Sequence, residues 1–286
     1  MNILLTGSGG FIGRNLKEYL QDKYTLFCPR SYELDLTNEK AVEQYFISHD
    51  IDFIIHCGTT GGARGVQDSP ETLDDNIAMV NNVLKSKKDN VRVILFGSGA
   101  MYDKSRNLHK VKEREIGQFL PYDLYGQSKM KIAEITEKRN DILCLNIFAC
   151  YGYNEKESRF PSYAVNQVIK GEDIVINQNV IFDYLFVEDM QKIVEHFIIH
   201  KPLHKIINIT PSDSISLVEI ADIVVNISGG GDCSQIKIKN PVMNNEYTGD
   251  NSVLLSEIQD LKFTSMQEGL LKLYNYIKQK SPEAVR

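Results

Sequence analysis

Hydrophobic residues in the first half of the chain form short continuous runs that alternate with stretches where they recur every three or four positions. Continuous runs are typical of strands buried on both faces, and the wider spacing is typical of amphipathic helices. Their alternation predicts strand–helix–strand units and a parallel sheet. The expected strands are residues 2–5, 24–28, 53–57, 91–96 and 142–148.

The pattern changes after Gly152, where the apolar segments shorten and prolines are scattered. We therefore expect one domain over residues 1–152 and a mainly separate lobe over residues 153–286. Segments within 180–210, for which 185–199 and 206–209 are the candidates, are expected to return to the main sheet. The predicted class is α/β, with a doubly wound parallel sheet and a smaller C-terminal lobe.

Composition narrows the possible partners and location. The chain has 286 residues, 42% of them hydrophobic, which is ordinary for a soluble protein. Its net charge of −6 and lack of a long basic run argue against nucleic acid or an anionic membrane as a partner. No charged flank and cleavage site precede the first strand, and no apolar stretch approaches the roughly 20 residues of a membrane span. We expect a cytoplasmic protein.

The five cysteines predict neither a disulfide framework nor a metal site. They are odd in number and show no Cys-x-x-Cys spacing. They are expected to be small apolar residues in or beside strands. Their positions are Cys28, Cys57, Cys144, Cys150 and Cys233.

A glycine-rich turn follows the first expected strand. Gly7, Gly10 and Gly13 lie between that strand and a helix, which is the context of a dinucleotide-binding fingerprint. Glycines permit the tight turn and let backbone N–H groups approach a pyrophosphate. We therefore expect residues 1–152 to be a dinucleotide-binding Rossmann domain with a doubly wound parallel Rossmann sheet. Residues 153–286 are then a mainly substrate-binding lobe, the smaller C-terminal substrate lobe. The three-three spacing differs from the usual two-three pattern, and a glycine-rich turn without a nucleotide is the alternative.

The end of the second strand bears on the choice of cofactor. An acidic residue that binds the adenosine ribose is usual there, but this chain has Cys28-Pro29-Arg30-Ser31. An arginine and a serine suit a 2′-phosphate, so NADPH/NADP is preferred and NAD remains possible. The alternative is that Arg30 is a solvated loop residue. Asp35 and Leu36, slightly further on, are also expected to bind the cofactor.

Tyr125 and Lys129 are four residues apart and share one face of an expected helix. A phenol near a fixed cation has its pKa lowered from about 10 towards the range of a working acid or base. The hydroxyl of Ser98 can hold a reacting oxygen beside that phenol. Together the three residues suit proton transfer coupled to hydride transfer. Each residue also has a structural alternative. Ser98 could be a turn hydroxyl, Tyr125 a core aromatic residue and Lys129 a solvated helix charge.

The motifs that carry this chemistry, taken in order, resemble the extended short-chain dehydrogenase/reductase family, which comprises nucleotide-sugar epimerases, dehydratases and reductases. The resemblance spans most of the chain, with Ser98 lying 27 residues before Tyr125. Through Thr59-Thr60-Gly61-Gly62 and Asp75-Asn76-Ile77, it is greatest to GDP-fucose synthase-like 4-keto reductases. The motifs are Thr6–Gly13, Ile54–Gly58, Gly97–Tyr102, Tyr125–Lys129 and Phe182–Asp189.

The resemblance implies roles for the matching residues. Tyr125 is the expected general acid/base, Lys129 lowers its pKa and holds the nicotinamide ribose, and Ser98 hydrogen-bonds the substrate oxygen. The expected cofactor-binding residues are Gly7, Gly9, Gly10, Phe11, Ile12, Gly13, Arg30, Asp35, Leu36, Cys57, Gly58, Thr59, Asn76, Tyr125, Lys129 and Phe148. The expected substrate-binding residues are Ser98, Gly99, Ala100 and Arg159.

Departures from the family pattern limit the reaction. Dehydratases carry an acidic residue just after the serine, where this chain has Gly99 and Ala100. GDP-fucose synthase-like enzymes also epimerise neighbouring carbons with a cysteine and a histidine. The position of that cysteine is Ala100 in this chain, and residues 157–160, where the histidine is expected, contain none. Phe182 replaces an arginine that often contacts a substrate phosphate, and Ala149 replaces an asparagine. Arg159 is either a replacement for the lost positive charge or a solvated side chain.

The expected function is NADPH-dependent reduction of the 4-keto group of a nucleotide-activated 4-keto-6-deoxy sugar, which belongs to nucleotide-sugar metabolism and cell-surface polysaccharide biosynthesis. The alternatives are an NAD-dependent nucleotide-sugar 4-epimerase and a non-catalytic dinucleotide-binding module. The resemblance also implies a homodimer through helices near 73–85 and 124–137. Met79, Val83 and Met130 are compatible with that interface, although core contacts explain them equally well.

Overall fold

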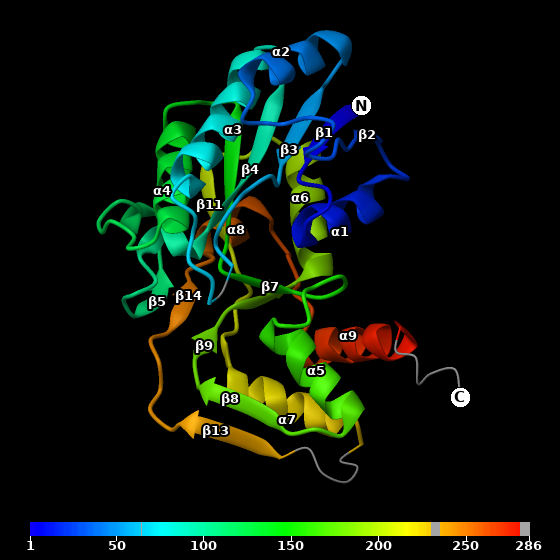
Figure 1. The fold of residues 1–286 in the computed structure, drawn as a ribbon, viewed down its shortest axis with the longest axis vertical. Coiled ribbons are helices and arrows are strands. Elements are labelled where there is room, and N and C mark those ends of the chain that lie inside the picture. The colour runs from blue at the N-terminus through cyan, green and yellow to red at the C-terminus, as the bar shows by residue number, and fades with distance from the viewer. Residues whose placement is uncertain (64, 230–234, 281–286) are drawn as a thin grey trace.

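The computed structural model describes residues 1–63, 65–229 and 235–280. Its centre is a six-stranded parallel sheet in the order β11-β6-β4-β3-β1-β2 (Figure 1). The predicted doubly wound α/β sheet is thereby confirmed. Its strands are β1 (Asn2–Thr6), β2 (Thr25–Phe27), β3 (Phe53–His56), β4 (Arg92–Ser98), β6 (Ile142–Ile147) and β11 (Ile206–Ile209).

Helices cover both faces of this sheet. One face packs against α1 and α6, and the opposite face packs against α2, α3 and α4. Neighbouring strand residues point to opposite faces, so Ile3 and Leu5 join one core cluster and Leu4 joins the other. Burial on both faces explains why the strands read as continuous apolar runs. These helices are α1 (Phe11–Leu20), α2 (Glu39–Ser48), α3 (Thr72–Ser86), α4 (Leu124–Glu137) and α6 (Val187–Ile199).

The chain changes direction at β1, pairing first with β2 on one side and then with β3 on the other. This reversal is a topological switch point, and ligands of open α/β sheets bind outside the carboxyl ends of the strands at such a point. The turn after β1 and the loop after β3 both leave the sheet there. The sheet topology therefore predicts that residues 7–13 and 57–62 lie at a ligand site.

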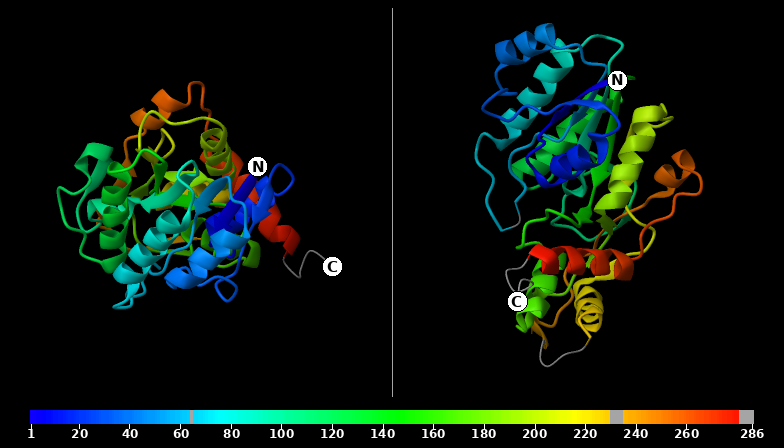
Figure 2. Two further views of the ribbon diagram at one scale, coloured as in Figure 1. Left: turned by 90° about the horizontal axis from the view of Figure 1, so that it is seen from above. Right: turned by 90° about the vertical axis from the view of Figure 1, so that its right-hand side faces the viewer.

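The second part of the chain forms a smaller group of elements below that sheet edge (Figures 1 and 2). Its helices are α5 (Phe160–Lys170), α7 (Leu217–Ile227) and α9 (Met266–Lys280). Its parallel strand pair is β8 (Ile174–Gln178) with β13 (Ile236–Asn240). The short helix α8 (Ser252–Glu257) lies instead beside β11 of the main sheet (Figure 1). A single hydrophobic cluster runs from β1 and α1 into α5, α7 and α9, so the two parts share one core.

Short strands and turns connect the two parts. The second parallel pair is β7 (Ala149–Tyr151) with β10 (Tyr184–Phe186). A four-stranded sheet contains β12 (Ile215–Ser216), β9 (Ile181–Phe182), β14 (Tyr247–Gly249) and β5 (Leu108–Val111) in that order. Two 3-10 helices, η1 (Gly99–Tyr102) and η2 (Glu113–Glu115), complete the secondary structure of the described residues.

Two segments were expected to return to the main sheet, and only one does. Ile206–Ile209 pairs with β6. Residues 187–199 form the helix α6 instead, because Met190, Ile193 and Phe197 recur at helical spacing and bury one face of that helix. Met79, Val83 and Met130 are buried within the single chain, so core contacts account for them.

Of the predicted cysteines, Cys144 and Cys150 lie in strands and are buried, whereas Cys28 and Cys57 follow strands and are half-buried. Cys233 lies outside the described residues. Burial raises the pKa of the Cys144 thiol to about 12, which keeps it protonated. Among the described residues, no cluster of histidine, cysteine or carboxylate groups has the arrangement of a metal site.

Candidate active site

The turn after β1 forms a backbone cradle. Gly7 has a φ of 66°, and a Cβ at this position would lie 2.6 Å from the carbonyl carbon of Cys57. A Cβ on Gly13 would lie 2.3 Å from the Gly7 oxygen. Both positions require glycine, because any side chain would push the turn away from the helix and from the loop after β3.

This cradle suits an anion. Gly10 caps α1 without a side-chain hydrogen bond, and the first turn carries no acidic residue. The first N–H groups of a helix have no partner within the helix, and the helix dipole favours negative charge there. Phe11, Ile12 and Gly13 begin α1, so their amides are among these groups. The cradle fits the pyrophosphate of a dinucleotide, with Gly9 on its exposed rim.

Arg30 lies beside the cradle. A Cβ on Gly9 would be 2.9 Å from Nη1 of Arg30, so the exposed guanidinium reaches the glycine turn from the end of β2. Asp35 lies further along, and its carboxylate accepts hydrogen bonds from the backbone N and the hydroxyl of Thr37. Leu36 approaches Gly58, with its Cδ1 3.2 Å from a Cβ built there. The Arg30 guanidinium therefore lies at the glycine turn, whereas the Asp35 carboxylate is engaged by Thr37.

Tyr125 and Lys129 lie on α4, which Asp123 caps by accepting a hydrogen bond from the backbone N of Gly126. The Lys129 ammonium is 5.4 Å from the centre of the Tyr125 ring and donates a 2.9 Å hydrogen bond to the Phe96 carbonyl. Lys129 is buried, and no carboxylate within the described ranges forms an ion pair with it. The Lys129 charge therefore lies close to the Tyr125 ring and is not neutralised by a carboxylate.

The groups around Lys129 leave its positive charge uncompensated. Burial, assisted by the nearby ammonium, lowers the pKa of His56 to about 3, so this histidine is neutral. Its Nδ1 is 2.9 Å from the Thr6 hydroxyl. Burial also raises the pKa of the Cys57 thiol, which remains protonated. None of these neighbours carries a negative charge near neutral pH.

Ser98 ends β4 and caps η1. Its Oγ accepts a hydrogen bond of 3.2 Å from the backbone N of Ala100. The next residue, Gly99, lies beside Tyr247, a residue of β14 that is 149 positions after Ser98. A Cβ on Gly99 would be 2.6 Å from both the Tyr247 hydroxyl and Cδ1 of Phe148. Gly99 therefore allows two aromatic side chains to approach Ser98.

The loop after β3 is fixed in place beside Tyr125. The Asn76 amide accepts hydrogen bonds from the backbone N of Thr60 and the hydroxyl of Thr59, and it donates to the Thr60 carbonyl and to Ser128. Asn76 is 2% exposed and these four bonds occupy it, so it supports the loop from behind. Its contact with a cofactor stays a prediction.

These elements bring together the residues that the sequence singled out. The glycine cradle, the Cys57–Thr59 loop, Ser98 and the start of α4 lie around the carboxyl ends of β1, β3 and β4. A sequence profile of the NAD dependent epimerase/dehydratase family matches residues 3–210. This chain belongs to that family.

Relatives within the epimerase/dehydratase family include enzymes that act on GDP-linked sugars. GDP-L-colitose synthase of Yersinia pseudotuberculosis is 40% identical over 109 residues, which are 36% of this chain and 35% of that protein. GDP-L-fucose synthase of Azorhizobium caulinodans is 36% identical over 105 residues, which are 35% and 34% of the two chains. The matched segment thus spans about a third of these relatives.

The same epimerase/dehydratase fold occurs along the whole chain in solved structures. A GDP-mannoheptose C4 reductase from Campylobacter jejuni with NADP bound has a TM-score of 0.84, and the match covers 97% of this chain and 98% of that one. Sequence identity is 22%, so this likeness concerns the fold. It supports the arrangement of sheet and flanking helices described above.

Arg159 was expected to be either a replacement for the lost positive charge or a solvated side chain. It lies at the N-cap of α5 and makes no capping hydrogen bond with its side chain. Its Nε lies 3.5 Å from Oε1 of Glu155, whose side chain is 1% exposed. Arg159 is near enough to Tyr247 to lower the pKa of that phenol, which burial raises overall. The Arg159 guanidinium therefore lies beside a buried carboxylate near the start of α5.

Tyr247 is the residue near Ser98 that sequence reasoning missed. It is a single tyrosine in the polar run Asn-Asn-Glu-Tyr-Thr-Gly-Asp, which has no recognisable motif. Its place is set by the pairing of β14 with β5 and β9. Local sequence carries no signal for such a long-range pairing.

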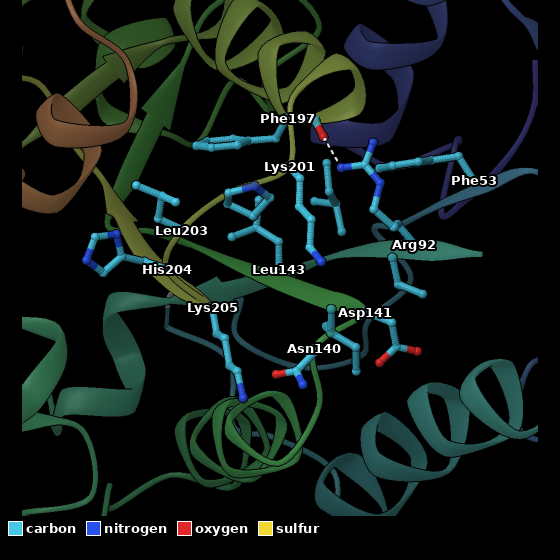
Figure 3. A pocket seen from close by; sticks show the side chains of 14 residues that line it. Phe53, Arg92, Asn140, Asp141, Leu143, Phe197, Lys201, Leu203, His204 and Lys205 are labelled. Carbon is cyan, nitrogen blue, oxygen red and sulfur yellow. Dashed lines mark hydrogen bonds between the residues drawn. The ribbon is translucent and has the colours of Figure 1, made fainter. Parts of the chain in front are cut away.

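A cavity of about 230 Å³ lies at the opposite edge of the sheet, near the first residues of β4 and β6 (Figure 3). Two of its basic residues, Arg92 and Lys205, cap helix ends. The Arg92 guanidinium donates to the carbonyls of Phe197, Ile198 and His200 at the end of α6, and Lys205 donates to the Glu137 carbonyl. These cations have structural partners, and the cavity is distant from Ser98 and Tyr125 along the strands.

Proposed function

We propose that this protein catalyses NADPH-dependent reduction of the 4-keto group of a nucleotide-activated 4-keto-6-deoxy sugar. The observation that carries the proposal is the convergence of Ser98, Tyr125 and Lys129 next to a backbone cradle suited to pyrophosphate. The names of the GDP-L-colitose and GDP-L-fucose synthase relatives support the substrate class.

The dinucleotide, when bound, supplies the hydride that reduces carbon 4. Ser98 donates a hydrogen bond to the ketone oxygen and holds it beside Tyr125. As the carbonyl becomes an alkoxide, Tyr125 transfers its proton to that oxygen and is later reprotonated from solvent. The Lys129 charge stabilises the phenolate that this transfer leaves behind. The product is the 4-hydroxy sugar.

The residues beside Ser98 support plain reduction over the other reactions of the family. Gly99 and Ala100 carry no acid or base, and both are buried. Elimination of water and epimerisation at neighbouring carbons each need a proton donor and acceptor close to the reacting carbon. The second candidate function is 4-epimerisation with retained NAD. It uses the same three residues, so an experiment has to distinguish it from reduction.

The proposed cofactor is NADPH. Arg30 supports it, because the guanidinium beside the glycine turn suits a 2′-phosphate. We further propose that the cofactor is bound by Gly7, residues 9–13, Arg30, Asp35, Leu36, residues 57–59, Asn76, Tyr125, Lys129 and Phe148. Ser98, Gly99, Ala100 and Arg159 are the proposed substrate contacts. Residues 1–152 and 153–286 are the proposed dinucleotide-binding and mainly substrate-binding parts, with β11 returning from the latter.

The decisive experiment mixes the protein with NADPH and a panel of GDP-, dTDP-, CDP- and UDP-linked 4-keto-6-deoxy sugars. A reductase consumes NADPH in a one-to-one ratio with the ketosugar and adds two mass units to the sugar. The corresponding 4-hydroxy sugars form a second panel, whose members a 4-epimerase interconverts with no net consumption of cofactor. Neither activity with any member of the two panels would contradict both proposals.

No helix among the described residues has the length and apolar character needed to cross a bilayer. We propose a cytoplasmic enzyme of nucleotide-sugar metabolism that supplies cell-surface polysaccharide biosynthesis. We also propose a homodimer through α3 and α4, supported by the half-buried side chains of Leu73, Ile77 and Leu124 on these helices. Sedimentation velocity tests it, and a monomer at micromolar concentration would contradict it.

A further inference from the structure

The backbone of Tyr125 is held by side chains at both its N–H and its carbonyl. The N–H donates a 2.8 Å hydrogen bond to Oδ2 of Asp68, which lies 57 positions earlier in the chain. The carbonyl accepts a 2.7 Å hydrogen bond from the Ser128 hydroxyl, further along α4. The first N–H groups of a helix have no partner within it, so the Asp68 carboxylate supplies one, and its charge suits that end of the helix dipole.

The same two side chains also hold the loop after β3. Oδ1, the other oxygen of Asp68, accepts a 2.8 Å hydrogen bond from the backbone N of Gly62. Ser128 accepts a 3.0 Å hydrogen bond from the amide of Asn76, which is also bonded to the backbone N and the carbonyl of Thr60. Two separate bridges therefore join this loop to the residue proposed as the general acid.

The Tyr125 ring touches the loop as well. A Cβ on Gly62 would be 2.9 Å from Cδ1, Cδ2 and Cε1 of the ring, so the loop backbone covers one face of the phenol. The place of the ring therefore depends on the place of Gly62, which Asp68 holds. Both the backbone and the ring of the tyrosine thus depend on the same short segment.

That segment continues directly from the residues expected to meet the dinucleotide. Residues 57–59 are proposed cofactor contacts, and Thr60 and Gly62, which Asn76 and Asp68 bind, follow them in the chain. A displacement of about 1 Å at a reacting group can lower a rate about 10²-fold. A loop that holds both the dinucleotide and the phenol keeps the acid in place relative to the hydride.

We propose that Asp68 is a positioning residue that joins Tyr125 to the loop after β3 and thereby holds the phenol where it protonates the substrate oxygen. A carboxylate suits this task because its two oxygens accept both hydrogen bonds at once, whereas an amide has one acceptor oxygen. The inference rests on the proposed keto reduction for its catalytic consequence. The competing interpretation is that Asp68 only caps α4, in which case its removal would lower stability and leave kcat unchanged.

The kinetic test places Asp68→Asn and Asp68→Ala in the parent and in Tyr125→Phe, with NADPH and the best ketosugar of the panel. Asparagine retains one acceptor oxygen and alanine none, so kcat should fall about tenfold and about hundredfold, respectively. KM for the ketosugar should change less, because protonation occurs in the transition state. In the Tyr125→Phe background both substitutions should change kcat by less than twofold. Values of kcat within twofold of the parent, or losses that are as large without the phenol, would overturn the inference.

Two control variants separate positioning from charge and from stability. Glu71→Gln makes the same change from carboxylate to amide three positions later, at an exposed residue whose side chain makes no capping hydrogen bond. It should leave kcat and the melting temperature unchanged. Ser216→Ala removes a helix cap elsewhere, the hydrogen bond from the backbone N of Glu219 at the start of α7. It should lower the melting temperature and retain kcat. A loss of kcat equal to that of Asp68→Asn would show that lost stability alone explains the effect and would overturn the inference.

A second measurement needs no substrate. In protein labelled with 3-fluorotyrosine, the Tyr125 signal is assigned by its loss in Tyr125→Phe. The ¹⁹F shift responds to groups that touch the ring, so Asp68→Ala should move this signal by more than its line width as Gly62 leaves the ring face. Glu71→Gln should leave the signal in place. An unmoved Tyr125 signal in Asp68→Ala would overturn the inference. If no ketosugar is reduced, the proposed function fails while this measurement still decides whether Asp68 holds the ring.

Discussion

Gly62 lies flat against the ring of Tyr125. A Cβ on Gly62 would be 2.9 Å from three carbons of that ring, and its φ of 71° is in the region that favours glycine. The Asp68 carboxylate accepts 2.8 Å hydrogen bonds from the backbone N of both residues. One side chain therefore joins the loop after β3 to the first turn of α4.

This relationship predicts the behaviour of Gly62→Ala. The added methyl group displaces the Tyr125 ring, and the left-handed backbone costs about 1–2 kcal/mol for a residue other than glycine. We expect kcat to fall at least tenfold and the melting temperature to fall by several degrees. Steady-state kinetics and thermal denaturation measure these changes.

Gly65→Ala is the control for Gly62→Ala. Gly65 has a φ of 75°, but a Cβ there would meet nothing within 4 Å. It should share the loss of stability and retain turnover. Equal losses of kcat in the two variants would show that the contact with Tyr125 is unimportant.

The proposed acid predicts a large effect of Tyr125→Phe. A positioned general acid typically contributes 10²–10⁴-fold, so kcat should fall by about that factor while the binding of NADPH changes little. Tyr122→Phe, at an exposed residue three positions earlier, should leave both unchanged. Turnover of Tyr125→Phe within threefold of the parent would remove this residue from its proposed role.

Arg30 should determine the preference for NADPH. Arg30→Ala removes a charge-assisted contact to a 2′-phosphate, so the Kd for NADPH should rise about tenfold while that for NADH stays constant. Lys17→Ala makes the same change of charge on the exposed side of α1 and should affect neither. Equal weakening of both dinucleotides, measured by fluorescence titration, would assign Arg30 a different function.

Glu155 predicts a pH dependence of stability. Burial raises the pKa of this carboxyl from 4.5 to about 7, despite hydrogen bonds from Ser162 and the charge of Arg159. The folded state therefore binds a proton more tightly than the unfolded state. At about 1.4 kcal/mol per pKa unit, the free energy of unfolding should fall by up to about 3 kcal/mol as the pH rises from 4.5 through 7.

Glu155→Gln should remove this contribution, so the variant gains stability over the parent as the pH rises and loses that advantage near pH 4.5. Urea denaturation at a series of pH values measures the difference. Glu157→Gln, at an exposed neighbour, should follow the parent at every pH. A constant difference between Glu155→Gln and the parent would contradict the raised pKa.

Much of the fold could be predicted from the sequence because buried parallel strands and amphipathic helices have distinct periodicities. The strands around Ile54 and Ile94, and the helix that holds Tyr125 and Lys129 on one face, are examples. Residues 185–199 were misread because the three-residue strand β10 runs directly into α6, so their apolar residues belong to two elements.

The parts of the site that the sequence did not predict depend on contacts between distant segments. Tyr247 is brought next to Gly99 by the strand pairings of β14, and Asp68 acts through the backbone of Gly62 and Tyr125. Every residue except proline has a backbone N–H, so a hydrogen bond from that group does not require a particular residue type at the donor position. Such residues could be recognised only when the tertiary arrangement was known.

The return of β11 to the edge of the main sheet has a practical consequence. Because β11 pairs with β6 along its whole length, a fragment that stops at Gly152 would leave the β6 edge without its neighbour. It would also lack α6, which shields one face of the sheet. Neither half of this enzyme is therefore suited to recombinant production by itself, and swapping halves with a relative would have to carry residues 187–209 along with the amino-terminal piece.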